Sequence, residues 1–177
     1  MTNSFSTAFE SFERSAFRLE TLDTYSVEEE KASFAAYLAG DPLPPPNLGV
    51  QWTSFLEKAK SAGKVITRVR LIPAKLTPYL KYEFDWWYAY NAKAGENILV
   101  VKSSEIGKFV SPERLSDFWL FDDQLLYDLS YDTTGNFLGA ELNENADELK
   151  ERCLLAEELC GNGLPLIQFI SAQRNGN

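Results

Sequence analysis

The chain has 177 residues, of which 45% are hydrophobic and 14% are aromatic, and its formal net charge is −9. This composition supports one well-filled hydrophobic core and excludes an intrinsically disordered chain, so we expect a single domain over residues 1–177. Histidine is absent, which excludes Ser-His and Cys-His nucleophiles and removes the commonest metal ligand of proteins.

The sequence contains no run of about 18 apolar residues and no basic and apolar leader at its N-terminus. We therefore expect no membrane span and a cytoplasmic location. The negative net charge opposes direct binding to nucleic acid, because phosphate groups would be repelled. The two cysteines, Cys153 and Cys160, would be separated on a helix by about 10.5 Å of rise, beyond the limit of about 7 Å for a disulfide. We predict packed thiols, no metal site and no cofactor.

Residues 1–62 are predicted to be mainly helical. Phe5, Phe9 and Phe12 recur at the spacing of one helix face, which predicts a helix over residues 4–14. Residues 17–20 then lead into residues 22–25, which look extended.

Two further helices are predicted in this part of the chain. Ser26 followed by Glu29 has the pattern of a capping box and predicts a helix that stops at Gly40, with Phe34, Tyr37 and Leu38 facing inward. The proline-rich residues 41–47 cannot be helical and predict a stiff, extended connector. The apolar stripe of Trp52, Phe55, Leu56 and Ala59 predicts the next helix over residues 50–62.

Residues 63–177 are predicted to be the α/β part and to begin with a strand–helix–strand unit. The β-branched run Lys64–Ile72 predicts a strand with Arg68 and Arg70 on one face. Thr77 followed by Pro78 is the pattern of a helix start, and Ala94-Gly95 that of a helix end. Residues 97–101 predict a second strand, parallel to the first.

Leu80–Tyr90 has a second interpretation. Its apolar residues also alternate with Lys81, Glu83 and Asp85, as in a half-buried strand. We favour the helix because of the Thr-Pro start, which makes the whole unit a βαβ motif.

The remaining chain predicts a strand meander followed by helices. Strands are expected over residues 117–121, 124–131 and 137–142, separated by turns at Asp122-Asp123 and at residues 133–136. Residues 146–160 predict an amphipathic helix, and residues 164–172 a short terminal helix. The expected fold is α+β: a helical N-terminal third, then a mixed sheet with one βαβ unit and a meander, with helices packed on the sheet.

Charge is unevenly distributed along the chain. Residues 64–114 contain nine Lys and Arg against five Asp and Glu, whereas residues 117–158 contain twelve acidic residues and two basic ones. The aspartates of the second segment invite a metal or acid/base hypothesis. Turn formation by Asp122 and Asp123 is the interpretation that we favour.

One group of residues has the chemistry of a ligand site. Arg68 and Arg70 on the first strand, with Glu83 and Glu96 nearby in the predicted unit, could hold a small anionic ligand near the strand carboxyl ends. Aromatic residues could stack on a planar ligand, and the complete candidate set is Arg68, Arg70, Tyr79, Glu83, Trp86, Glu96 and Trp119. The alternative is that the charged residues form structural ion pairs and the aromatic residues belong to the core.

Several blocks of sequence resemble an actinobacterial family known only as a domain of unknown function. The blocks lie at residues 17–25, 63–73, 76–84, 94–101, 117–123 and 135–139 and together span most of the chain. Members of that family are often encoded beside helix-turn-helix regulators and small acidic companion proteins. The chain departs from the family at Trp86-Trp87, where a glycine break is expected. The order of elements is also similar, more distantly, to the half-domain of phospholipase D-like proteins, whose His-dependent catalysis is excluded here.

The resemblance implies association with regulation but no activity. We therefore expect a non-enzymatic regulatory or accessory protein that binds a protein partner, such as a basic helix-turn-helix regulator that faces the acidic segment 117–158. The alternative is a small-molecule-binding protein or an enzyme of a biosynthetic pathway. A deep pocket that holds Arg68, Arg70, Glu83 and Glu96 would favour that alternative.

Overall fold

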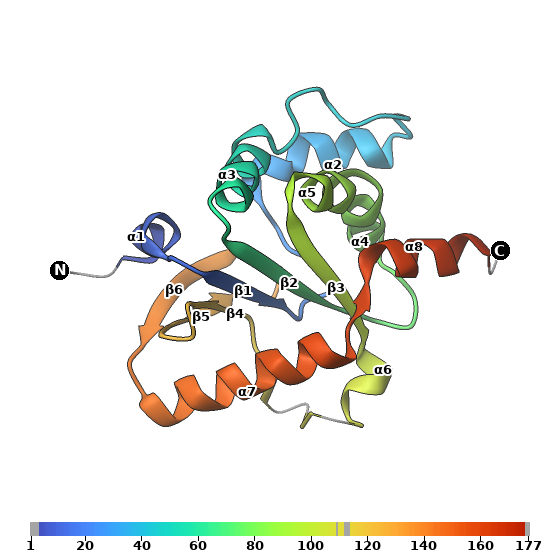
Figure 1. The fold of residues 1–177 in the computed structure, drawn as a ribbon. Coiled ribbons are helices and arrows are strands. Elements are labelled where there is room, and N and C mark those ends of the chain that lie inside the picture. The colour runs from blue at the N-terminus through green and yellow to red at the C-terminus, as the bar shows by residue number, and fades with distance from the viewer. Residues whose placement is uncertain (1–3, 109, 112–113, 176–177) are drawn as a thin grey trace.

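The computed structural model describes residues 4–108, 110–111 and 114–175. Its centre is a seven-stranded mixed sheet with the order β6-β5-β4-β1-β2-β3-β7 (Figure 1). β1, β2 and β3 are parallel, and each of the other strands runs antiparallel to its neighbours. The strands are β1 Ser15–Glu20, β2 Val65–Ile72, β3 Glu96–Lys102, β4 Phe118–Phe121, β5 Leu125–Tyr131, β6 Phe137–Asn143 and β7 Leu164–Pro165.

Helices cover both faces of the sheet (Figure 1). On one face, α7 and α6 bury Leu155, Leu159 and Ile106 against the alternate residues of β1 to β5. The opposite face carries the remaining helices, in three contiguous apolar clusters. The helices are α1 Phe5–Ser11, α2 Lys31–Leu38, α3 Val50–Ser61, α4 Pro78–Tyr82, α5 Tyr88–Ala94, α6 Ser103–Ile106, α7 Ala146–Asn162 and α8 Leu166–Asn175, with a 3₁₀ turn η1 at Glu28–Glu30 and a π-helical segment η2 at Glu83–Trp87.

The predicted α+β class and the βαβ unit are confirmed. β2 and β3 are parallel neighbours, and the chain between them is helical from Pro78 to Ala94. The Thr77 side chain accepts a hydrogen bond from the backbone N–H of Leu80, as the Thr-Pro pattern predicts. Leu80–Tyr90 is therefore a helix, and its alternating pattern arises because two stripes of this helix are buried. The meander β4-β5-β6 is confirmed as well.

One strand in the N-terminal third was not predicted. β1 lies inside the sheet, between β2 and β4, so residues 1–62 contribute a central strand as well as helices. The alternation of Phe17 and Leu19 with Arg18 and Glu20 is typical of a half-buried strand, but the run is short and was assigned to the segment that leads into residues 22–25. In the structure both charged side chains are buried.

The capping box at Ser26 was also predicted wrongly. Ser26 forms an isolated bridge to Asn136, and the 3₁₀ turn η1 precedes α2, which starts only at Lys31. Leu38 was expected to face inward but is 59% exposed. The cysteines are free, and Cys160 is exposed rather than packed. Within the described residues, no helix has the length and apolar character needed to cross a bilayer.

Candidate functional site

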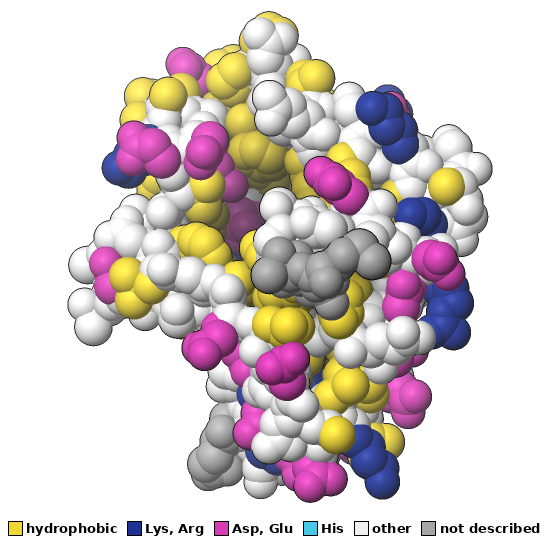
Figure 2. Space-filling model, turned by 90° about the vertical axis from the view of Figure 1, so that its left-hand side faces the viewer, with side chains coloured by type: hydrophobic (Ala, Val, Ile, Leu, Met, Phe, Trp, Pro, Cys, Tyr) yellow, Lys and Arg dark blue, Asp and Glu magenta, His cyan; other side chains and the backbone are white. Residues whose placement is uncertain are grey.

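A cavity of about 670 Å³ lies above β1, β2 and β4, on the face of the sheet that α1, α3 and α5 cover. Figure 2 shows a hollow on this side of the molecule, with hydrophobic side chains along its walls and acidic side chains at its rim and in its depth. Nine aromatic residues line the cavity: Phe5, Tyr25, Trp52, Tyr79, Trp87, Tyr88, Trp119, Tyr131 and Phe137. The parallel strands contribute Arg18 and Glu20 of β1 and Arg68 from the middle of β2 to the lining.

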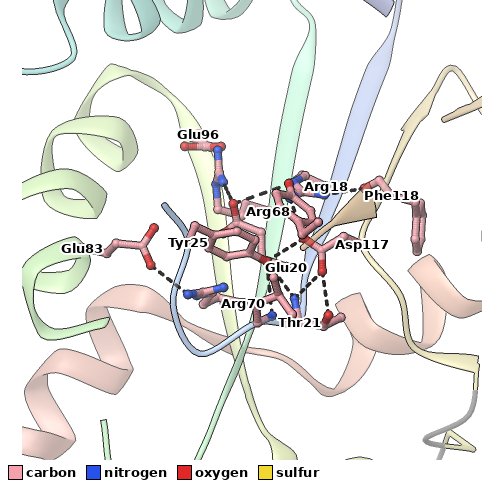
Figure 3. Close-up of polar contacts among 12 residues, drawn as sticks. Arg18, Glu20, Thr21, Tyr25, Arg68, Arg70, Glu83, Glu96, Asp117 and Phe118 are labelled. Atoms are coloured by element: carbon pink, nitrogen blue, oxygen red, sulfur yellow. Dashed lines mark hydrogen bonds and ion pairs between the residues drawn. The ribbon is translucent and has the colours of Figure 1, made fainter. Parts of the chain in front are cut away.

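The floor of the cavity is a buried network of ion pairs (Figure 3). In the parallel pairing of β1 with β2, Arg18 lies beside Arg68 and Glu20 beside Arg70, so all four side chains project from the same face. The Arg68 guanidinium donates to Glu20 and, at 2.9 Å, to Glu96. Tyr88 donates its hydroxyl to the second oxygen of Glu20 at 3.0 Å. Burial alone would raise the pKa of Glu20, but the arginines outweigh it and hold the pKa below its ordinary value.

Asp117 closes this network from the segment before β4. One of its oxygens accepts from Arg18 Nη2 at 2.7 Å and from the Tyr25 hydroxyl at 2.6 Å. The other accepts from the backbone N–H and the hydroxyl of Thr21. Asp117 therefore fixes the end of β1 and the Tyr25 ring that lines the cavity.

Arg70 is fully buried beneath the cavity. It donates to Glu83 at 3.0 Å, and its guanidinium lies 4.9 Å from the centre of the Tyr25 ring. Among the described residues, its Nε and Nη1 atoms have no hydrogen-bond partner. Burial, with Glu20 and Glu30 nearby, raises the pKa of Glu83 even though Arg70 opposes this shift.

Glu30 belongs to η1 and lies at the cavity wall, in an environment that differs from that of Glu83. Its Oε2 accepts from the Tyr79 hydroxyl at 2.7 Å. Burial raises the pKa of Glu30 to about 7, although the Tyr79 hydrogen bond acts in the opposite direction. This carboxyl group therefore changes charge near neutral pH.

Two polar atoms of the lining are buried and outside hydrogen-bond geometry among the described residues, although the Trp52 indole N–H faces the Glu96 carboxyl group and favours its ionised form. Within the part of the chain that the structure describes, neither the Asn91 Oδ1 acceptor nor the Trp52 Nε1 donor meets the geometry of a hydrogen bond. Asn91 is only 4% exposed. An unsatisfied buried polar group costs about 1–3 kcal/mol, so an occupant that hydrogen-bonds to it would recover that energy.

The structure brings together most of the residues predicted from the sequence. Arg68, Tyr79, Glu83 and Trp119 line the cavity. Arg70 and Glu96 are buried next to it, paired with Glu83 and Arg68. Trp86 lies apart, in a cluster with Tyr37 and Tyr82.

The sequence interpretation missed half of the network. Arg18 and Glu20 were missed because β1 was not recognised as a strand, although they alternate as Arg68 and Arg70 do. Asn91 carries no pattern in the sequence that points to a cavity. Asp117 was noted only as one member of an acidic group.

The aspartates of that group are separated in the structure. Asp122 accepts hydrogen bonds from the backbone N–H groups of Glu13, Arg14 and Ser15, and Asp132 holds the turn before β6. Asp122 and Asp123 have φ values of 53° and 59°, the left-handed region that turns require. Their roles are those of turn and capping residues.

Comparisons with known proteins give a family but no activity. No curated protein matches the chain. Among solved structures, Nuc from Salmonella typhimurium, a phospholipase D family member, is similar with a TM-score of 0.49 and 12% sequence identity, over 90% of this chain and 86% of that chain. A family model described as "Domain of unknown function (DUF6879)" matches residues 3–171, so the chain belongs to this family.

Proposed function

We propose that the protein binds a small molecule in the cavity above β1 and β2. The observation that carries this proposal is a cavity of about 670 Å³ whose lining includes a buried amide oxygen, Asn91 Oδ1, with no hydrogen-bond partner among the described residues. Ligand sites commonly have volumes of about 300–1,000 Å³, mostly apolar walls and a few convergent polar groups.

The network below the cavity supports binding more than catalysis. Arg18, Arg68 and Glu20 are held by one another and by Asp117, Glu96 and Tyr88. Such mutual contacts fix the side chains before a ligand arrives, which lowers the entropic cost of binding. A catalytic side chain needs an atom that is free to contact the substrate. The guanidinium groups of Arg18 and Arg68 are instead engaged in ion pairs.

Substitution of Asn91 by Leu tests the proposal. Because Asn91 Oδ1 has no partner, Asn91→Leu should raise the melting temperature of the ligand-free protein, or leave it unchanged. The same variant should lose most of the thermal shift caused by compounds that stabilise the wild type in a screen of metabolites.

Tyr90→Leu is the matched control on the same helix, because Tyr90 is 49% exposed and does not line the cavity. This variant should keep the ligand-induced shift. If Asn91→Leu keeps the full shift as well, the compounds bind elsewhere and the proposal fails.

Partner binding is a second candidate, supported by the acidic surface of α7. Glu148, Glu151, Glu157 and Glu158 are exposed on this helix. A basic regulator of the helix-turn-helix type is the partner that such a surface would suit. Co-purification that is lost when these four glutamates are changed to glutamine, with the fold intact, would support this candidate.

A further inference from the structure

The charged groups around the cavity are unequal in number. Its lining contains five glutamates and two arginines among the residues that the structure describes. With the groups that pair with the lining, four cations, Arg18, Lys31, Arg68 and Arg70, face seven carboxyl groups, Glu20, Glu28, Glu29, Glu30, Glu83, Glu96 and Asp117.

The arginines of the lining are already committed to carboxylates. Arg18 contacts Asp117 at 2.7 Å and Glu20 at 3.7 Å, and Arg68 contacts Glu20 and, at 2.9 Å, Glu96. An anionic ligand would have to displace one of these carboxylates and leave it buried without a counter-ion, which is strongly unfavourable. The small anionic ligand expected from the sequence is therefore disfavoured.

Two carboxyl groups of the lining, Glu29 and Glu30, form no ion pair among the described residues, and Glu30 is the less exposed of the two. The structure gives it only the Tyr79 hydroxyl as a hydrogen-bond partner among the described residues. The charged groups that act on it from other elements are Glu20 on β1, Arg68 and Arg70 on β2 and Glu83 in η2. In the empty cavity Glu30 holds its proton up to a pH of about 7. A cation in the cavity would replace that proton.

The aromatic walls suit the same ligand. The rings in this site already lie against cations, since Arg70 is 4.9 Å from the centre of Tyr25 and Arg68 is 6.0 Å from the centre of Tyr88. An organic cation against Tyr or Trp gains about 0.5–2 kcal/mol, more when it is desolvated. The Asn91 acceptor offers an N–H group of the ligand a further hydrogen bond.

We propose that the cavity binds an organic cation, an amine with an apolar or aromatic body, whose charge is met by Glu30 and by the surrounding aromatic rings. This inference rests on the proposed function and names the class of its ligand.

An isosteric series tests the charge of the ligand. Tryptamine, tryptophol and indole-3-acetate share the indole ring and differ in carrying an ammonium, a hydroxyl or a carboxylate. In calorimetric titrations of the full chain, tryptamine should bind at least about tenfold more tightly than tryptophol, a difference of about 1.4 kcal/mol. Indole-3-acetate should bind most weakly.

The role of Glu30 gives a second readout. Tryptamine affinity should rise about tenfold per pH unit up to about pH 7 and then level off, because Glu30 must release its proton. Calorimetric titrations in buffers of different ionisation enthalpy should detect the release of that proton on binding. Glu30→Gln should remove the tryptamine preference and the pH dependence but leave tryptophol binding unchanged. Glu57→Gln on α3 is the control and should alter neither, because Glu57 is exposed and does not line the cavity.

Two results would overturn the inference. If tryptophol or indole-3-acetate binds in the cavity as tightly as tryptamine, the ligand is not a cation, although the proposed function stands. If tryptamine, phenethylamine and spermidine all fail to bind the folded protein at millimolar concentration, the cation is excluded. Neutral or anionic compounds could then still raise the melting temperature of the wild type but not that of Asn91→Leu. In that case the proposed function stands and the cationic ligand class does not.

Discussion

Asp117 is 4% exposed and accepts four hydrogen bonds from Arg18, Thr21 and Tyr25. Its contact with Arg18 pairs the buried guanidinium with a carboxylate. Removal of one partner from a buried ion pair leaves the other charge uncompensated, which costs far more than the net value of the pair.

Asp117→Asn should therefore destabilise the protein by about 3–5 kcal/mol, because the one ion pair that Arg18 would keep among the described residues is the longer one, to Glu20. Urea unfolding of the two proteins measures this difference. Asp41→Asn makes the same chemical change at an exposed position and should alter stability by no more than about 0.5 kcal/mol. Equal effects of the two substitutions would contradict the role assigned to Asp117.

Asp122 joins the β4–β5 turn to the segment before β1. Burial acts against its ionisation, but the three backbone N–H donors outweigh burial and hold its pKa below the ordinary value. A carboxyl group with a lowered pKa stabilises the fold above its unfolded pKa of about 3.9, and the contribution disappears as pH falls through the folded value.

Asp122→Asn should cost about 1–3 kcal/mol at pH 7, since asparagine tolerates the positive φ but accepts these hydrogen bonds without a charge. The difference between variant and wild type should shrink below about pH 4. Guanidinium unfolding at pH 7 and pH 3 measures both values, and a difference that does not change with pH would argue against the charge.

At the scale of elements, the helix from Pro78 to Ala94 carries Tyr79, Glu83, Tyr88 and Asn91 to the cavity. Four residues at spacings of four, five and three would not share one face of a regular α-helix over its whole length. The π-helical segment η2 inserts additional residues per turn and brings them to the same side. It lies within the segment where the glycine break was expected.

Thr77→Ala should destabilise the protein by about 0.5–2 kcal/mol, because Thr77 caps this helix and also donates its hydroxyl to the Asp23 carbonyl at 2.7 Å. Thermal unfolding measures the loss. Thr77→Ser retains the hydroxyl and should restore most of the stability. If serine and alanine behave alike, the methyl group rather than the cap matters.

The elements differ in how far the sequence could predict them. Thr77, Pro78 and Gly95 mark the ends of the helix by local chemistry, so the helix and the strands beside it were predictable. β1 has no such marks, because its buried Arg18 and Glu20 acquire partners such as Arg68, Tyr88 and Asp117, which are distant in the sequence. The cavity could not be predicted beyond Arg68, Glu83 and some aromatic residues, since its walls meet only in the tertiary structure.

At the scale of the whole molecule, the burial of Glu30 makes stability depend on pH in an unusual direction. A carboxyl group with a raised pKa, such as Glu30, holds its proton in the folded state above its unfolded pKa of about 4.3. Stability is therefore fully present below that value and is lost as pH rises towards about 7.

Glu30→Gln should match the wild type near pH 4 and be more stable than it by a few kcal/mol at pH 8 without ligand. Glutamine can still accept the hydrogen bond from Tyr79, so the comparison isolates the charge. Chemical denaturation across this pH range measures the two curves. Parallel curves would mean that Glu30 ionises normally in the fold.

The central position of β1 has a consequence for how the protein assembles during synthesis. β1 leaves the ribosome first, yet the strands on either side of it begin only at Val65 and Phe118. Until β4 is made, the nascent chain has no complete sheet, and the edge of β1 that pairs with β4 remains open to other chains. Because this long-range closure also completes the buried charge network, the last folding step should be slow and should create the cavity at the same moment.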